Sequence, residues 1–136
     1  MKNDTPTNNQ FVTDTMAVIL RLEKRKMGKD AKSLFQSTEA GETFIYIPSM
    51  VFAEILYLSE KNRIKASLDN VESYLRQYPH FKEYPLTFSV IKTSAKINDI
   101  PELHDRLITG TALSLNLPLI TNDPIIEASA FVQTIW

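Results

Sequence analysis

Short β-branched segments alternate with helical segments along the whole chain, and this alternation constrains the fold more than any other feature. Residues 43–47 (Thr-Phe-Ile-Tyr-Ile) are typical of a strand, and residues 49–61 have helical character after the turn at Pro48. Such alternation is typical of βαβ units, in which successive strands are parallel and helices cover both faces of the sheet. The sequence therefore predicts an α/β three-layer sandwich around a central parallel sheet.

The individual elements follow from the same patterns of apolar residues and of glycine and proline breaks. Strands are expected at residues 11–14, 43–47, 86–88, 119–121 and 131–136, and helices at 15–26, 30–40, 49–61, 64–77, 89–97, 101–116 and 125–130. An apolar stripe on the helix at 101–116 is expected from Leu103, Leu107, Ile108, Ala112 and Leu115. Gly110 lies inside this helix and indicates close helix–sheet packing there. Residues 1–10 are polar, so we expect a disordered tail before one domain at 11–136.

Composition excludes several kinds of site. The 136 residues include no cysteine and only two histidines, which rules out disulfides, thiolate metal sites and a His-rich zinc site. A metal would therefore be bound mainly by oxygen, which favours Mg²⁺ or Mn²⁺. The net charge is −1, so nucleic acid would have to be attracted by local patches and by the metal. No apolar run is long enough to cross a membrane, and we expect a cytoplasmic protein.

Four acidic residues stand against the apolar pattern around them. Asp14 ends the first expected strand and Asp123 comes just after the fourth, and the carboxyl ends of parallel strands share one edge, where ligands bind. Glu54 is the only charged residue in the segment 50–58, and burying an unpaired carboxylate is costly. Asp105 lies early in its helix, at the border of the apolar stripe. We therefore expect the four carboxylates to face one crevice.

Carboxylates gathered in one crevice without cationic partners repel one another and raise each other's pKa values. A divalent cation removes that repulsion, and Mg²⁺ prefers carboxylates together with several retained waters. Such a metal lowers the pKa of a bound water, orients a phosphate and stabilises developing negative charge. The pattern therefore favours metal-dependent hydrolysis of phosphodiesters.

Each acid taken alone also has an ordinary structural explanation. Asp14 and Asp123 are placed to act as N-caps of the helices that follow them. Asp105 can be a solvated acid in the first turn of its helix, and Glu54 can belong to a buried ion pair. Only the combination of all four favours a site.

Four segments carry a resemblance to the PIN-domain ribonucleases, particularly to the VapC-type toxin branch and its stand-alone relatives. They are residues 12–17 (Val-Thr-Asp-Thr-Met-Ala), 46–56 (Tyr-Ile-Pro through Glu-Ile-Leu), 103–108 (Leu-His-Asp-Arg-Leu-Ile) and 119–124 (Leu-Ile-Thr-Asn-Asp-Pro). The resemblance covers residues 11–136 and implies a PIN-like nuclease domain with strand order 3-2-1-4-5. Each motif is weak alone, but their order and their places at element boundaries are specific.

The resemblance implies a Mg²⁺ or Mn²⁺ site made from Asp14, Glu54, Asp105 and Asp123. Asp14 resembles the central ligand, and Glu54 resembles a ligand through water or the acid that orients the nucleophile. The implied reaction is in-line attack on RNA phosphodiesters, which leaves 5′-phosphate and 3′-hydroxyl ends. The resemblance also implies a homodimer, a role as the toxin of a toxin–antitoxin pair, and inhibition by an antitoxin that inserts a segment into the active-site groove.

Residues beside the four acids are candidates for supporting roles. Thr121 resembles the family's hydroxyl residue near the last acid, and Thr15 is placed either for a similar hydrogen bond or for helix capping. His104 can shuttle a proton or contact a phosphate, although a surface histidine is the more ordinary explanation. Arg106 can grip a phosphate or pair with an acid, and pairing is favoured.

The basic stretch around Lys24, Arg25 and Lys26 can contact RNA phosphates near the active edge or form a solvated helix face. Tyr57 and Trp136 are expected in the core or in a dimer interface rather than in RNA stacking. These surface features therefore leave the mode of substrate binding open.

Other function classes are less consistent with the sequence. A non-catalytic PIN-like module that binds nucleic acid or protein is the main alternative, but loss of an acid would favour it and all four are present. A phospho-accepting receiver domain requires paired acids after the first strand and a lysine after the last, and this chain has neither. A 5′-nuclease acting on DNA structures would carry extra acids and helical insertions.

Overall fold

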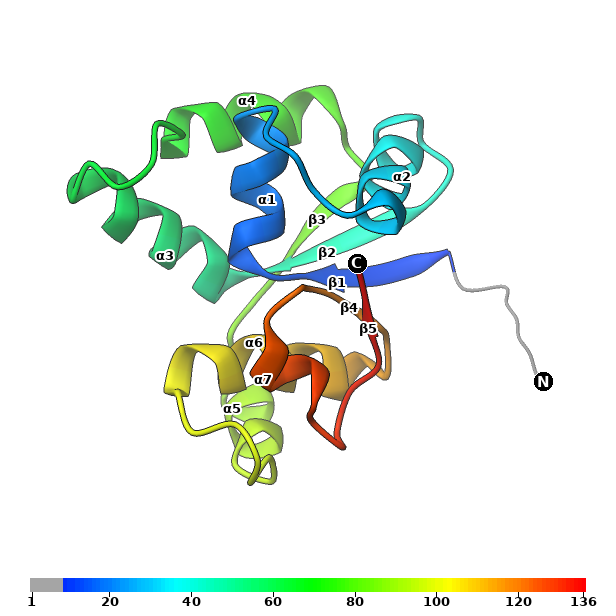
Figure 1. Ribbon diagram of the computed structural model, residues 1–136, viewed down its shortest axis with the longest axis vertical. Helices are drawn as coiled ribbons and strands as arrows, with labels where there is room; N and C mark the ends of the chain where they lie inside the picture. Colours follow the sequence, from blue (N-terminus) through cyan, green and yellow to red (C-terminus); the bar gives the residue numbers. More distant parts are fainter. Residues whose placement is uncertain (1–8) are drawn as a thin grey trace.

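A computed structural model describes residues 9–136 (Figure 1). Five strands form one sheet in the order β3-β2-β1-β4-β5, and every neighbouring pair is parallel. The predicted parallel sheet and its strand order are therefore confirmed. Most of the tail expected at residues 1–10 lies outside the described residues, and β1 already begins at Gln10.

Helices cover both faces of the sheet, as predicted. The strands are β1 (Gln10–Thr13), β2 (Phe44–Pro48), β3 (Phe81–Tyr84), β4 (Leu119–Ile120) and β5 (Thr134–Ile135). The helices are α1 (Thr15–Leu22), α2 (Lys29–Glu39), α3 (Ser49–Glu60), α4 (Leu68–Gln77), α5 (Phe88–Ser94), α6 (Leu103–Leu115) and α7 (Pro124–Glu127). In Figure 1, α1 to α4 lie on one side of the sheet and α5 to α7 on the other.

The third strand is not where the sequence pattern placed it. The prediction of a strand at residues 86–88 is wrong, because β3 lies at Phe81–Tyr84, where no strand was predicted. Phe81 of β3 is buried and its ring centroid lies 5.5 Å from that of Phe35 on α2. Phe88 instead begins α5, because the Thr87 side chain accepts a hydrogen bond from the Val90 amide and so caps the helix.

Capping side chains also shift the starts of two helices. The start of α4 is later than predicted because Ser67 and Asn70 form a reciprocal capping box. The start of α6 is later because the Glu102 side chain accepts a hydrogen bond from the Asp105 amide. The predicted apolar stripe on α6 is wrong at Leu103, which is 54% exposed. The last strand is also shorter than predicted, since only two residues of the segment 131–136 pair with β4.

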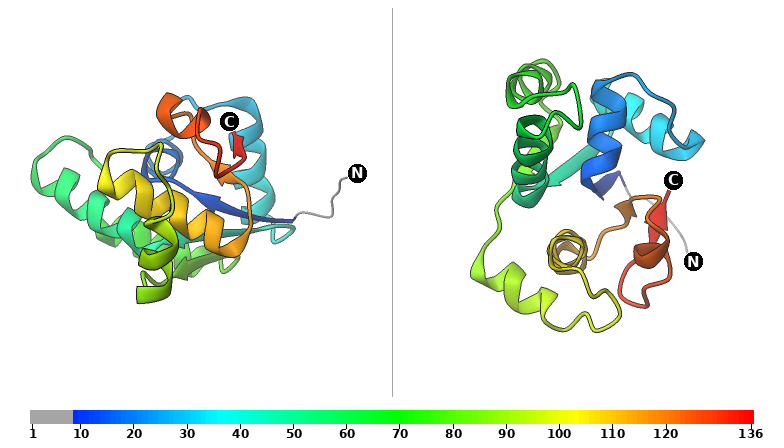
Figure 2. Two further views of the ribbon diagram at one scale, coloured as in Figure 1. Left: turned by 90° about the horizontal axis from the view of Figure 1, so that it is seen from below. Right: turned by 60° about the vertical axis from the view of Figure 1, so that its left-hand side comes forward.

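Two glycines lie where other elements pack directly against the backbone. A Cβ atom at Gly28 would lie 2.5 Å from the backbone carbonyl carbon of Trp136, so the chain end packs on the α1–α2 connection. A Cβ atom at Gly110 would lie 2.8 Å from Cβ and 3.0 Å from Cα of Ser94. The expected helix–sheet contact at Gly110 is therefore wrong, since this glycine lets α6 approach α5. Figure 2 shows these two helices packed together on one side of the sheet.

The core lies between the sheet and its helices, and it contains the apolar residues of the central strands. Val12, Ile45 and Leu119 are fully buried there. No helix within residues 9–136 combines the length and the apolar character that a membrane crossing requires. The three central strands are thus fixed by burial, and the chain segments that leave their carboxyl ends are held close together.

Candidate active site

The four acidic side chains singled out in the sequence line one cavity of about 410 Å³. Asp14 follows β1, Asp123 follows β4 closely, Glu54 comes from α3, and Asp105 lies in the first turn of α6. Figure 1 shows the N-terminal ends of α1, α3 and α6 around the same end of the sheet. Parallel strands place their carboxyl ends at that edge, which explains why residues so distant in sequence meet there.

Asp14 is buried, and its carboxylate has two roles. Its Oδ1 atom accepts a hydrogen bond from the Ala17 amide at 2.9 Å and caps α1, as the ordinary structural explanation required. The same carboxylate lines the cavity and is hydrogen-bonded to the Thr121 side chain. Burial raises the pKa of Asp14 to about 6, against the hydrogen bonds that lower it, and the nearby Asp123 and Glu54 carboxylates add to the rise.

Asp123 resembles Asp14 in its local structure. Its Oδ1 atom accepts hydrogen bonds from the amides of Ile125 at 2.9 Å and Ile126 at 3.2 Å, which caps the short helix α7. The Asp123 amide donates to Thr121 Oγ1 at 3.1 Å. Thr121 is fully buried and is hydrogen-bonded to both Asp123 and Asp14, so it fixes the relative positions of the two acids.

Asp105 is less buried than Asp14, but its surroundings are similarly acidic. Burial raises the pKa of Asp105 to about 6, and repulsion from Glu102, Asp123, Glu54 and Asp14 contributes in that order. The four cavity carboxylates are therefore close enough to influence one another electrostatically.

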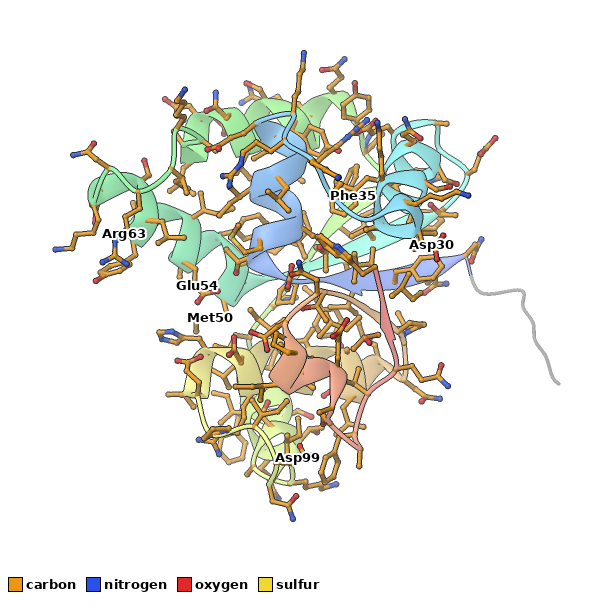
Figure 3. All side chains as sticks on the ribbon, in the orientation of Figure 1. Asp30, Phe35, Met50, Glu54, Arg63 and Asp99 are labelled. Carbon is orange, nitrogen blue, oxygen red and sulfur yellow. The ribbon has the colours of Figure 1, made fainter. Side chains whose placement is uncertain are left out.

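Glu54 is held from two sides. The Thr15 hydroxyl donates a hydrogen bond to Glu54 Oε1, while Glu54 Oε2 lies 3.6 Å from Nδ1 of His104. The same His104 nitrogen lies 3.3 Å from Oε2 of Glu102. Figure 3 shows Glu54 on the part of α3 that faces α6. Thr15 and His104 thus orient a carboxylate that would otherwise rotate freely in the cavity.

The donor chemistry of this cavity fits a hydrated Mg²⁺ or Mn²⁺ ion. In the described part of the chain, none of the four carboxylates forms an ion pair with lysine or arginine. Residues 9–136 also contain no group of three or more His, Asp or Glu side chains that is drawn together closely enough to hold an ion directly. The acids therefore line the cavity without forming a closed cage, and an ion that keeps several waters suits them better than one that needs protein ligands on every side.

The raised pKa of Asp14 predicts a pH-dependent stability in metal-free buffer. The pKa of Asp14 is 3.8 in the unfolded chain and about 6 in the folded protein. Between pH 3.8 and pH 6 the folded protein therefore binds more protons than the unfolded chain does. Stability should therefore fall as pH rises through 6, and Asp14 should contribute roughly 1 kcal/mol more stability at pH 5 than at pH 7. Urea unfolding in EDTA at pH 5 and at pH 7 measures this stability difference for the wild type and for Asp14→Asn. The variant should be the more stable protein at pH 7, and its advantage over the wild type should shrink at pH 5. An advantage that does not change with pH would contradict the assignment.

The other sequence candidates lie in different places. Lys24, Arg25 and Lys26 directly follow the C-terminal end of α1, whereas Asp14 caps its N-terminal end, about 12 Å away for a helix of this length. Arg106 forms no ion pair with any residue from 9 to 136, contrary to the favoured expectation, and its buried Nε atom has no hydrogen-bond partner there.

Sequence reasoning did not single out Glu102. Its side chain caps α6, contacts His104 and contributes the largest repulsion acting on Asp105. The signal that could have indicated it was its place directly after Pro101, at the start of a predicted helix. Glutamate is not among the preferred N-cap residues, so the pattern was weak.

Comparisons with known proteins identify the family and the fold. The model of the PIN domain family matches residues 11–132. The VapBC2 complex of Rickettsia felis, solved bound to a promoter DNA fragment, contains a similar chain at 17% identity and a TM-score of 0.69, covering 93% of this chain and 98% of that one. The DNA-bound VapBC complex of Salmonella typhimurium gives 18% identity, a TM-score of 0.67, and coverage of 93% and 96%. FitAcB of Neisseria gonorrhoeae gives 16% identity and a TM-score of 0.64, and the match covers 93% of this chain and 96% of that one.

No curated protein sequence matched the chain significantly. The solved structures are too distant in sequence to establish more than the fold, but the family model covers most of the chain. The chain belongs to the PIN-domain family.

Proposed function

We propose that the protein is a Mg²⁺- or Mn²⁺-dependent endoribonuclease. The observation that carries the proposal is the meeting of Asp14, Glu54, Asp105 and Asp123 around one cavity. Burial and mutual repulsion raise the pKa values of Asp14 and Asp105. Acids that only stabilise a fold are usually placed where their charges are solvated or paired, so such raised pKa values favour a functional site. A divalent cation bound among these oxygens would relieve the repulsion.

Asp14, Asp105 and Asp123 would hold the metal, with Glu54 at its edge. When bound, a divalent cation supplies an activated water and stabilises negative charge on the phosphate. Thr121 holds the Asp14 carboxylate and accepts a hydrogen bond from the Asp123 backbone amide, and the Thr15 hydroxyl donates to Glu54 Oε1. The Asp123 carboxylate is held by the amides of Ile125 and Ile126. Glu54 Oε2 then accepts the proton of the attacking water. The water oxygen forms a bond to phosphorus, the bond from phosphorus to O3′ breaks, and the 3′ oxygen takes a proton from solvent.

Metal removal tests the proposal. The purified protein is incubated with end-labelled RNA in Mg²⁺, in Mn²⁺ or in EDTA, and the product ends are identified. We expect 5′-phosphate and 3′-hydroxyl ends with either metal, and a rate at least a hundredfold lower in EDTA that returns when metal is restored, because a bound metal contributes several kcal/mol to such reactions.

Two matched variants control for a contaminating nuclease. Asp105 lies in the first turn of α6 and lines the cavity, whereas Asp69 lies in the first turn of α4 and is exposed. Asp105→Asn should lose cleavage and Asp69→Asn should retain it. Cleavage that survives both EDTA and Asp105→Asn would point to another enzyme or another mechanism.

We further propose that the protein is the toxin of a toxin–antitoxin pair, acts as a homodimer, and is inhibited by an antitoxin. What supports the toxin role and the antitoxin is that similar chains occur in solved VapBC complexes and in a toxin–antitoxin complex from Klebsiella pneumoniae (17% identity, TM-score 0.63). The homodimer follows from the family resemblance alone. Light scattering of the purified chain, alone and with the product of a neighbouring reading frame, tests the assembly. A non-catalytic binding module remains the alternative, and the metal experiment decides between them.

A further inference from the structure

The helix α3 extends the wall of the carboxylate cavity beyond the acids. Glu54 and Leu58 are one helical turn apart, and both line the cavity. Tyr57 and Lys61 follow Glu54 by three and seven residues, spacings that keep them on the same side of a helix. The Lys61 amide still bonds to the Tyr57 carbonyl at 3.1 Å, so the helical geometry reaches this residue. Lys61 therefore lies about 10 Å from Glu54 along the cavity side of α3.

Tyr57 is unusual among the tyrosines of the chain. It is 54% exposed, whereas Tyr46, Tyr74, Tyr78 and Tyr84 are all partly buried. The Lys61 ammonium nitrogen lies 5.6 Å from the centroid of the Tyr57 ring. A cation in this position contacts one face of a ring at most, and the exposure of Tyr57 leaves ring surface accessible to a ligand.

A cation at this place has a consequence for a polyanionic substrate. The four cavity carboxylates repel the phosphates of a nucleic acid, and the protein as a whole carries a net charge of −1, so it does not attract them either. Lys61 forms no ion pair with the residues that the structure describes, so no carboxylate among them neutralises its charge. An aromatic ring beside an unneutralised cation is the combination that binds single-stranded nucleic acid, through base stacking and phosphate contact.

We infer that Tyr57 and Lys61 bind the single-stranded RNA next to the cleaved bond: the Tyr57 ring stacks on a base, and Lys61 contacts a neighbouring phosphate. This inference rests on the proposed ribonuclease function and identifies residues that bind the substrate at that site. It departs from the expectation from sequence that Tyr57 belongs to the core, because its side chain is 54% exposed. The expected alternative, a dimer interface, is an outcome of the test below.

Binding of an uncleavable probe tests the inference without relying on activity. A fluorescently labelled 2′-O-methyl RNA octamer is titrated with the full chain and followed by anisotropy. Tyr57→Ala should weaken Kd about tenfold, the scale of one lost base stack, while Tyr57→Phe should bind within twofold of the wild type. Lys61→Gln should lower the slope of log Kd against log salt by about 0.7, the value for one phosphate contact on a single strand.

Leu56→Ala is the matched control. Leu56 is exposed on the same helix, but a spacing of two residues from Glu54 puts it on the opposite side. This variant should bind like the wild type. In cleavage assays Tyr57→Ala should raise KM about tenfold and leave kcat within twofold, since a stacked base adds binding energy without touching the reacting atoms.

Two results would overturn the inference: no octamer binding by the wild type, or an unchanged Kd for Tyr57→Ala. If an unchanged Kd came with dissociation of a dimer in light scattering, Tyr57 would belong to a protein interface instead. Failure of the ribonuclease proposal is distinguishable, because then the wild type cleaves no RNA with any metal, while the binding of the octamer still reports on Tyr57 and Lys61.

Discussion

Replacing Asp14 by Asn is expected to abolish RNA cleavage while the protein stays folded. Asparagine is as good an N-cap as aspartate, so the hydrogen bond from the Ala17 amide and the start of α1 are retained. What is lost is the negative charge of the most buried of the four cavity acids. If Asp14 is the central metal ligand, the rate should fall about a thousandfold, which corresponds to about 4 kcal/mol of transition-state stabilisation.

Single-turnover cleavage at saturating Mg²⁺ measures the rate, and titration calorimetry of the metal-free protein measures the loss of metal binding. Asp30→Asn is the control, because Asp30 also lies in the first turn of a helix but is exposed and far from the cavity (Figure 3). A rate for Asp14→Asn within tenfold of the wild type would remove Asp14 from the reaction. Loss of the circular dichroism signal would instead show that the charge is needed for folding, which the raised pKa of Asp14 argues against.

The fold could be predicted from sequence because its strongest signals are local and repeated. Each central strand is a short apolar run followed by a helix, and this repetition predicts parallel strands whatever the exact boundaries are. Asp14 and Glu54 could be found because a charged residue inside an apolar pattern has few explanations in a folded protein. The sequence pattern therefore identified the acids that the fold brings together.

Apart from the helix starts that local caps shift, the failures depend on tertiary surroundings that local signals do not report. β3 is a strand because Phe81 packs on Phe35, a contact that no local pattern could reveal. Leu103 fits the apolar stripe of α6 but lies where no element covers it. Arg106 was expected to pair with an acid, yet none lies within reach in the described structure. Each of these outcomes depends on what surrounds a residue in space.

Gly110 is another residue whose role depends on a distant partner, and replacing it should have the largest effect on stability of any exchange discussed for this chain. An added Cβ would lie 2.8 Å from Ser94 Cβ and 3.0 Å from its Cα, which is too close for either helix to keep its place. Helix propensity alone favours alanine over glycine by about 1 kcal/mol, so the sign of the effect is decided by this clash. Gly110→Val should lower the free energy of unfolding by about 3 kcal/mol.

Thermal unfolding should show this as a Tm lower by roughly 10 °C. Ala53→Val adds bulk at an exposed position of α3 and should change Tm far less. A double-mutant cycle tests the cause, because Ser94→Gly removes the nearest side-chain atoms and should recover part of the stability lost in Gly110→Ala. Additive losses would show that Ser94 is not the partner that matters. Because Asp105 lies on the same helix, separation of α5 from α6 should also displace this carboxylate, so Gly110→Val should slow cleavage even below its Tm.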